Sequence, residues 1–360
     1  MSKRKNQHFV PRFYLRNFSY LLNGKQIGVY NTKNAFCFKT APIKSQGARD
    51  FFYGTDGIIE NRLSEIEGRL AAIVKKILAA SAAQLTADEH YDLILFIILT
   101  ISRNPSKIVG LREMMIKMRE NLLKEEPETD IDTVLPLLTH EDFVRLSLVN
   151  CEQLVKGIMD LEYLVIENFT STPFITSDNP VVKYNQYLEA KRYSQGKTGL
   201  ASIGLEIFVP ISKNRMILLY DRNCYDVKMS TERFLKVKRD EEVDSLNLLQ
   251  FVNCINTIYF SDNTEEAYLR DMHRWSMEFD KGNVPYSKLG YLAENKAQII
   301  HGNEKANLAI NGTSDCEIGL KISGIKFKES AKYRTIHKGS VQPRPGSFAY
   351  ESLERNDGNV

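Results

Sequence analysis

One uninterrupted apolar run constrains the fold of this chain more than any other feature. The run LILFIILTI occupies residues 93–101, in a segment that opens with Thr86 and Glu89 and ends before Pro105. Thr86 and Glu89 have the spacing of a capping box, and proline commonly stops a helix, so the segment predicts one helix. The second half of this helix is apolar on every side, which requires other elements to surround it in water. Because a bilayer span needs about 20 residues, we expect a buried core helix.

Further helices are predicted on both sides of this run. Apolar residues recur at steps of three and four from Ile59 to Ile77, which predicts an amphipathic helix over about residues 58–80. A third helix is expected to end near Lys124, and a fourth to run from about Thr139 to about Met159. Residues 58–160 therefore read as a helical block.

Strand patterns lie before and after that block. The runs QIGVY and AFCFK flank the polar turn NTKN, which predicts a β-hairpin over residues 26–40. Short β-type runs, among them LEYLVIENF, LEIFVPI and MILLYD, fill much of residues 161–261. The predicted fold class is therefore α+β: a mixed β-sheet from the N-terminal hairpin and residues 161–261, with the helical block 58–160 inserted.

The second half of the chain also carries predictions. A long helix is expected over roughly 231–254, and residues 316–328 are expected to form one hairpin. We predict a single α+β domain over residues 1–282. Residues 283–360 are less periodic and are predicted to be a C-terminal extension that is partly flexible, with a tail-like composition near its end.

Charge and cysteine content narrow the classes of protein further. The 48 basic and 45 acidic residues give a net charge of +3, so the chain as a whole is not a polyelectrolyte. Basic residues cluster at 1–16 and 321–344, where they could bind the phosphates of a nucleic acid or simply be solvated. The five cysteines are far apart, which predicts reduced thiols in the cytoplasm and no zinc site. The basic N-terminus lacks an apolar stretch behind it, so we expect no signal peptide and no membrane partner.

Familiar catalytic motifs are missing. The sequence contains no GxxxxGK[ST], GxGxxG, HExxH or GxSxG pattern. P-loop, Rossmann, zincin and α/β-hydrolase chemistry are therefore unsupported. Any catalytic group must come from residues that lie apart in the sequence.

The segment QHFVPRFYLRNF is the first positive signal. Pro11 favours extended backbone before it, so we expect an extended start and a helix from about Arg12. The aromatic residues at positions 9, 13, 14 and 18 are expected to fix the segment to the core. His8 would then be held where it can transfer protons, and Arg12 where it can bind a phosphate or carboxylate. Alternatively, His8 ends a strand and Arg12 pairs with a buried carboxylate.

Charged residues on two helices form the second signal. Glu60 and Glu67 lie two helical turns apart on nearly one face of the helix over 58–80, about 10 Å apart along its axis. That spacing is usual for a solvated face, but Glu67 follows the core residue Ile66 and could meet Arg12 or Arg103. Arg103 ends the most buried helix, so it needs either an acidic partner or the carbonyl groups of the helix C-terminus.

A sharp turn supplies the third signal. In FITSDNPVV, a strand leads into Ser177, Asp178, Asn179 and Pro180. Asp and Asn before proline favour an Asx turn, and a carboxylate at the end of a strand often belongs to an active site. The alternative is a plain structural turn.

These motifs together resemble a bacterial family known only as domain of unknown function 4238. The resemblance rests on QHFVPRFYLRNF and TSDNP, supported by RNP after the apolar helix, and covers about Gln7 to Asp262. It implies no activity, but it implies which positions matter: Gln7, His8, Pro11, Arg12, Tyr14, Glu67, Arg103, Ser177, Asp178, Asn179, Pro180 and Asn247.

Our first hypothesis is a nucleic-acid-processing enzyme that acts on phosphodiesters. The proposed catalytic residues are His8, Glu67 and Asp178, and the proposed substrate-binding residues are Gln7, Arg12, Tyr14, Arg103, Ser177 and Asn179. They would converge on one cavity that holds an acid/base pair and two cations. Carboxylates could also hold Mg²⁺, although no metal motif is present and no metal ligand is assigned. A bacterial defence or toxin role would suit such a protein.

The second hypothesis is a binding module. In that case the same polar groups form a structural ion-pair network, and the basic termini bind nucleic acid or a protein partner. The two hypotheses differ in geometry. An enzyme requires the polar groups around an open cavity, whereas a structural network requires them paired and dry.

Overall fold

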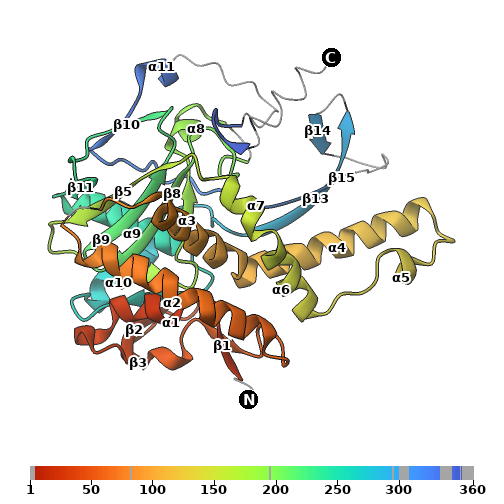
Figure 1. Ribbon diagram of the computed structural model, residues 1–360, viewed down its shortest axis with the longest axis horizontal. Helices are drawn as coiled ribbons and strands as arrows, with labels where there is room; N and C mark the ends of the chain where they lie inside the picture. The colour runs from red at the N-terminus through yellow and green to blue at the C-terminus, as the bar shows by residue number, and fades with distance from the viewer. Residues whose placement is uncertain are drawn as a thin grey trace.

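The fold is α+β, as expected, and its layers can be followed in Figure 1. The computed structural model describes residues 5–81, 83–193, 196–293, 296–299, 308–332, 343–348 and 350. Helices and strands alternate irregularly along the chain, and several sheets are built from strands that are distant in sequence.

A five-stranded mixed sheet forms the centre of the molecule, in the order β11-β5-β9-β8-β7. Its strands are β5 (Glu162–Asn168), β7 (Val182–Tyr184), β8 (Glu206–Ser212), β9 (Arg215–Tyr220) and β11 (Phe234–Val237). Strand β11 runs parallel to β5, and the other pairs are antiparallel.

Both faces of this sheet are buried. Val165 and Ile217 belong to a core shared with the N-terminal helices, whereas Leu164, Phe208 and Leu218 belong to a second core on the opposite face. Successive side chains of a strand point to opposite faces, so most positions along these strands must be apolar. That requirement explains the continuous apolar runs in the sequence.

The first core is filled by the helices α2 (Ile58–Ala79) and α3 (Ala87–Ser102), as the periodicity predicts. Thr86 and Glu89 form the expected capping box at the start of α3. The apolar run of α3 is buried nearly throughout, and α2, α6 (His140–Val149) and α7 (Cys151–Lys156) pack around it. The helix predicted over 139–159 is in fact these two helices, separated at Asn150.

Helix α4 (Pro105–Glu125) extends away from the core as an arm, with α5 (Ile131–Val134) and α6 returning beside it (Figure 1). Pro105 ends α3 and is also the first residue of α4, a position that needs no backbone N–H. Among the described residues, no single helix is both long and apolar enough to cross a membrane; α3 and α4 meet the two requirements only as a pair bent by 57°.

A second sheet contains the predicted hairpin. Strands β2 (Gln26–Asn31) and β3 (Phe36–Pro42) form the hairpin, and the sheet order is β3-β2-β12-β6, with β12 at Thr257–Phe260 and β6 at Thr176–Ser177. The strands expected in one sheet are therefore divided between two. Helix α9 (Asp240–Asn253) contacts both β6 and β7, so this buried helix separates the two sheets.

Two local predictions in this half of the chain are wrong. The helix expected from about 231 begins only at Asp240, because residues 234–237 pair with β5 as strand β11. The hairpin expected over 316–328 does not form; β16 (Ile325–Phe327) pairs with β10 (Tyr225–Val227) instead. In both cases a distant strand supplies hydrogen bonds that a local pattern cannot reveal.

The C-terminal segment packs on the rest of the chain. Strands β13 (Pro285–Ala293), β14 (Lys296–Ile299) and β15 (Leu308–Thr313) form a sheet that contacts α4. Arg344, counted above among the bases available to phosphate, is buried: its guanidinium binds both carboxylate oxygens of Asp160 and the carbonyl of Gly157. The remaining short elements are β1 (Asn6–His8), α1 (Arg12–Leu15), η1 (Arg16–Phe18), η2 (Tyr20–Leu22), η3 (Ile43–Ser45), β4 (Ala48–Asp50), α8 (Gln186–Ala190), α10 (Glu266–Ser276) and α11 (Glu329–Lys332).

Replacing Phe96 with alanine tests whether α3 holds the N-terminal segment. The Phe96 ring is 1% exposed and lies 5.8 Å from the ring of Phe13 and 6.0 Å from that of Tyr14. We expect Phe96→Ala to lower the free energy of unfolding by about 3–5 kcal/mol in urea denaturation. Phe36→Ala is the control, because Phe36 is 58% exposed; equal losses in the two variants would contradict the assignment.

Candidate functional site around His8

The N-terminal segment has the conformation that its sequence predicts. Strand β1, which includes His8, pairs antiparallel with β4, and α1 begins at Arg12. Pro11 lies between them with φ −59° and ψ 136°, an extended conformation that separates strand from helix. His8 and Arg12 are therefore held on two short elements joined by a rigid connection.

Aromatic packing fixes this segment to the core. The Phe9 ring lies 5.6 Å from Phe52, and the Phe13 ring packs on Phe96 of α3. Tyr14 is fully buried, and its hydroxyl is hydrogen-bonded to Thr176 Oγ1 (2.6 Å) and to the Pro210 carbonyl (2.5 Å). Tyr14, proposed above to bind substrate, is thus used to anchor the segment.

Gly47 holds the backbone beside His8. Its carbonyl accepts hydrogen bonds from the N–H groups of Phe9 (2.9 Å) and Val10 (3.0 Å), and its own N–H donates to the Tyr259 hydroxyl. Gly47 has φ +59°, and a Cβ there would lie 2.7 Å from Val10 Cβ. Only glycine fits this close approach without strain.

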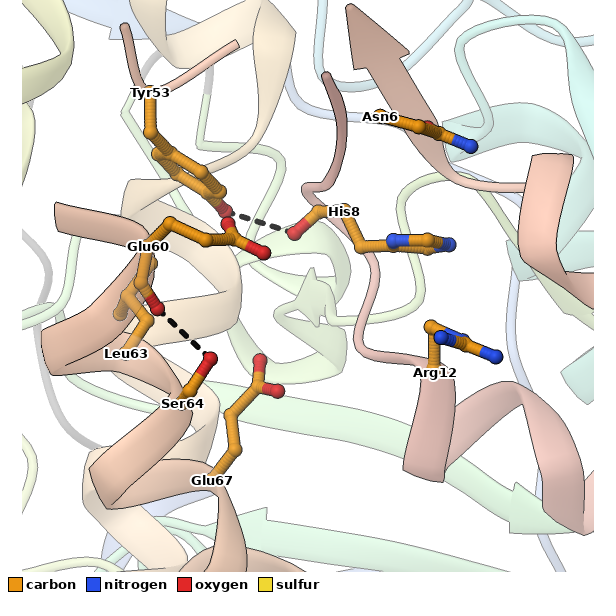
Figure 2. Close-up of a pocket in the computed structure, with 8 residues that line it drawn as sticks. All are labelled: Asn6, His8, Arg12, Tyr53, Glu60, Leu63, Ser64 and Glu67. Carbon is orange, nitrogen blue, oxygen red and sulfur yellow. Dashed lines mark hydrogen bonds between the residues drawn. The ribbon is translucent and has the colours of Figure 1, made fainter. Parts of the chain in front are cut away.

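A cavity opens next to this segment, with a volume of about 220 Å³. Its lining residues are Asn6, His8, Arg12, Tyr53, Glu60, Leu63, Ser64 and Glu67. Figure 2 shows His8 and Arg12 on the N-terminal segment, with Glu60 and Glu67 projecting from α2 on the other side. We call this the His8 cavity.

His8 is neutral at physiological pH. The pKa of its imidazole is lowered to about 4, mainly by burial and then by the nearby Arg12 guanidinium, while a hydrogen bond to the Ile43 backbone opposes the shift. Nε2 of His8 is buried and has no hydrogen-bond partner among the residues that the structure describes. Arg12 is exposed and likewise has no hydrogen bond or ion pair within the described part of the chain. An unpartnered ring nitrogen of His8 and the unpartnered guanidinium of Arg12 therefore lie close together in the described part of the chain.

Glu67 forms an ion pair with Arg103 behind the cavity. This contact is one of the two that the sequence suggested for Glu67. Arg103 is 1% exposed, and its Nη1 lies 2.7 Å from Glu67 Oε1. Burial by itself lowers the pKa of Arg103, but Tyr53 and Glu67 raise it above its ordinary value. Tyr53 is close to the guanidinium without hydrogen-bond geometry, and Nε and Nη2 of Arg103 have no partner in the described residues.

Asp178 does not belong to the His8 cavity. Its carboxylate is buried and accepts hydrogen bonds from the backbone N–H groups of Ile255 (2.7 Å), Asn256 (2.9 Å) and Thr257 (3.0 Å). Burial raises the pKa of Asp178 to about 6, although the three N–H donors lower it. A carboxylate with this number of backbone donors fixes the turn between α9 and β12.

The neighbours of Asp178 are equally engaged. Ser177 donates to Gln250 Oε1 (2.8 Å), and Asn179 donates to the Asn253 carbonyl (3.0 Å). Asn104, the N-cap of α4, donates to Asn179 Oδ1 (2.9 Å), so the RNP and TSDNP motifs touch each other. None of Ser177, Asp178 and Asn179 lines the His8 cavity.

The structure thus divides the predicted set of residues. His8, Arg12 and Glu67 line one cavity with Arg103 directly behind it, whereas the TSDNP residues form a separate hydrogen-bonded turn. Gln7 lies next to His8 in sequence, but its side chain is bound to the backbone of Gly54 (2.9 Å) and Tyr53 (2.5 Å).

Comparison with known proteins identifies the family of this chain. The family model for "Protein of unknown function (DUF4238)" matches residues 6–264. The chain belongs to this family. Searches of the curated proteins and of the solved structures found no match. The DUF4238 match covers the whole His8 cavity and the TSDNP turn, and it ends before the sheet β14-β13-β15.

Sequence reasoning missed part of the cavity lining in this DUF4238 protein. Ser64 lies one turn from both Glu60 and Glu67, so the periodicity of α2 could have placed it on the same face. Tyr53 and Asn6 could not have been found, because they reach the cavity through the pairing of β1 with β4 and the turn that follows.

The titration of His8 provides a direct check on the cavity. We expect its imidazole to titrate near pH 4 by NMR, well below free histidine, because burial and Arg12 disfavour the charged form. Arg12→Gln removes the positive charge and should raise the midpoint. Arg16→Gln, an exposed arginine on the same segment, should leave it unchanged; a wild-type midpoint near 6.5 would contradict the burial of the ring.

Removing the Asp178 carboxylate tests its structural role. Asp178→Ala leaves three part-buried N–H groups without their acceptor, at a cost of up to about 1–3 kcal/mol each. We expect a loss of at least about 3 kcal/mol in the free energy of unfolding, and a smaller loss in Asp178→Asn, whose amide oxygen still accepts. Asp50→Ala, at an exposed ion pair with Lys5, is the control. A loss in Asp178→Ala as small as in this control would refute the role.

Proposed function

We propose that the His8 cavity is the active site of a nucleic-acid-processing enzyme that hydrolyses phosphodiester bonds. One observation carries the proposal: a neutral imidazole, whose Nε2 has no partner among the described residues, and an exposed guanidinium without a partner among them lie together at an open cavity. A buried ring nitrogen without a partner costs free energy, so its retention points to a ligand that completes it.

The geometry favours this reading over a purely structural network. A structural network pairs its members and excludes water. Asp178 has this character, since its carboxylate is buried and fully engaged. The His8 cavity has the opposite character: Arg12 is exposed, and Nε2 of His8 lacks a partner in the described residues.

The proposed reaction uses His8 as general base. A neutral imidazole can take a proton from water while the water oxygen attacks phosphorus. Arg12 binds the non-bridging phosphate oxygens and stabilises the charge that develops on them. When the bond from phosphorus to the leaving oxygen breaks, His8 returns the proton to that oxygen, so the protons balance over the cycle.

Access to His8 is part of this proposal. Nε2 is covered in the structure. The exposed Arg12 side chain lies near it without a partner in the described residues. We propose that the Arg12 side chain moves when it binds the phosphate and that Nε2 becomes accessible in the same step. Apo geometry often tightens only when substrate binds.

Carboxylates supply the remaining chemistry of the cavity. Glu67 is held by Arg103, and Glu60 faces the same space (Figure 2). Carboxylate oxygens suit Mg²⁺, but the described residues contain no group of three or more His, Cys, Asp or Glu side chains arranged to hold a metal ion. We therefore vary Mg²⁺ in the experiment and assign it no role in the proposed mechanism.

The setting of the proposed enzyme is the bacterial cytoplasm, where the five free thiols would stay reduced. The exposed bases Lys321, Lys326 and Lys328 would add sequence-independent attraction for a nucleic acid. Buried Arg344 takes no part in that attraction. A role as a defence or toxin effector is the biological context that we propose.

A cleavage assay tests the function. Purified protein is incubated with RNA, single-stranded DNA and duplex DNA, each with Mg²⁺ and with a chelator. We expect cleavage of at least one substrate, lowered about 10²–10⁴-fold by His8→Ala and strongly by Arg12→Gln, with folding checked by circular dichroism. Arg16→Gln, four residues from Arg12, should cleave like the wild type.

The pH profile adds a second criterion. Because the neutral form of His8 is active and its pKa is about 4, the rate should be constant through neutral pH and fall only as the pH drops towards 4. Cleavage that survives His8→Ala, or no cleavage of any substrate, would overturn the enzyme proposal. Binding without cleavage would support the binding-module alternative.

A further inference from the structure

A second cavity lies between helix α4, strand β7 and the C-terminal sheet, with a volume of about 290 Å³. Its polar lining includes Lys107 of α4 and Lys183 of β7, and much of its wall is apolar, from Ile101, Val181 and Leu200. None of its lining residues lines the His8 cavity. We call it the lysine cavity.

Neither of the two ammonium groups forms an ion pair with a carboxylate in the described part of the chain. Neither the Lys107 nor the Lys183 ammonium group makes a hydrogen bond or ion pair with any residue that the structure describes. Asp315 is the one acid among the lining residues, all of which are described. Its carboxylate already accepts hydrogen bonds from the N–H groups of Lys197 (2.9 Å) and Thr198 (3.2 Å) and from the Thr198 hydroxyl (2.5 Å).

Without a bound ligand, it is energetically unfavourable to hold the two ammonium groups in this cavity. Burial lowers the pKa of Lys183 to about 8, with Asp315 raising it and Lys107 lowering it, and burial also lowers the pKa of Lys107. Two like charges beside an apolar wall cost free energy unless an anion joins them. Lys107 also lies in the first turn of the 21-residue helix α4, where the helix dipole favours an anion.

We propose that the lysine cavity binds a small molecule that carries an oxoanion, carboxylate or phosphate, on an apolar body, with the oxoanion held between Lys107 and Lys183. The apolar wall then receives the body of the ligand. Ser106 and Asn179 also line the cavity and add polar groups beside the two lysines.

The C-terminal segment completes this site. Pro285 and Tyr286 of β13, with Gly312 and Thr313 of β15, form part of the lining. These strands lie beyond the family match, which ends at residue 264. The Lys117 ammonium group of α4 donates to the Ser287 carbonyl, which ties β13 to the helix that carries Lys107. The site therefore depends on a segment that the DUF4238 match does not include.

Binding of simple probes tests the proposal by calorimetry on the full chain. Phenyl phosphate and benzoate carry the two oxoanions on the same ring, and benzyl alcohol is the neutral control. We expect saturable binding of at least one anionic probe, at least tenfold tighter than that of benzyl alcohol. Lys107→Met and Lys183→Met should each weaken it about tenfold or more. Lys75→Met, at an exposed lysine of α2, should leave it unchanged.

Two further measurements make the outcome specific to this cavity. Arg12→Gln should not change the affinity for phenyl phosphate, because Arg12 belongs to the His8 cavity. Pyridoxal 5′-phosphate with borohydride labels lysines: the neutral Nζ adds to the aldehyde carbon, water leaves, and hydride reduces the imine to an amine. Mass spectrometry should find Lys183 labelled at least about fivefold faster than Lys75, with phenyl phosphate protecting it.

The wild-type labelling keeps the test decisive even if a lysine variant fails to fold. Equal labelling of Lys183 and Lys75 would overturn the proposal. So would the absence of saturable binding by either anionic probe, or binding that Arg12→Gln abolishes. A preference for phenyl phosphate or for benzoate identifies which oxoanion the cavity takes.

Discussion

The burial of helix α3 is the interaction on which the rest of the structure depends. Its apolar run must be surrounded, and α2, α6, α7 and the N-terminal rings surround it. Phe96 packs against Phe13 and Tyr14, so the same burial that stabilises the core fixes the segment carrying His8. Arg103, the residue after α3, is buried by the same packing and must find a carboxylate there. Glu67 of α2 supplies it.

The motif Arg103-Asn104-Pro105 connects the region behind the His8 cavity with the TSDNP turn beside the lysine cavity. Arg103 binds Glu67 behind the His8 cavity, and Asn104 both caps α4 and binds Asn179 beside the lysine cavity. Two neighbouring residues thus fix the relative positions of α2, α4 and the TSDNP turn. The turn itself is rigid because Asp178 accepts three backbone N–H groups. Both proposed sites are therefore held by elements with little freedom to move.

Much of the His8 cavity could be predicted from the sequence, because its signals are local. Pro11 and the flanking rings place His8 and Arg12, and the helical period places Glu67 beside the core. Asp178 could not be placed in this way. A carboxylate on a strand-end turn is equally suited to catalysis and to binding backbone N–H groups, and the choice depends on residues 255–257, which are far away in sequence. The pairing of Lys107 with Lys183 could not be predicted from the sequence. The two lysines are far apart in the chain, and only the folded structure brings them to one cavity.

The sequence by itself determined the elements whose hydrogen bonds and packing are local. The capping box at Thr86, the helix over 58–79 and the hairpin of β2 and β3 all follow from nearby residues. Tertiary structure decided the division into two sheets, the pairing of β11 and β16 with distant strands, and the burial of Arg344 against Asp160. The physical reason is that a strand or a buried charge is satisfied by a partner anywhere in the chain, and a local pattern shows only that a partner is needed.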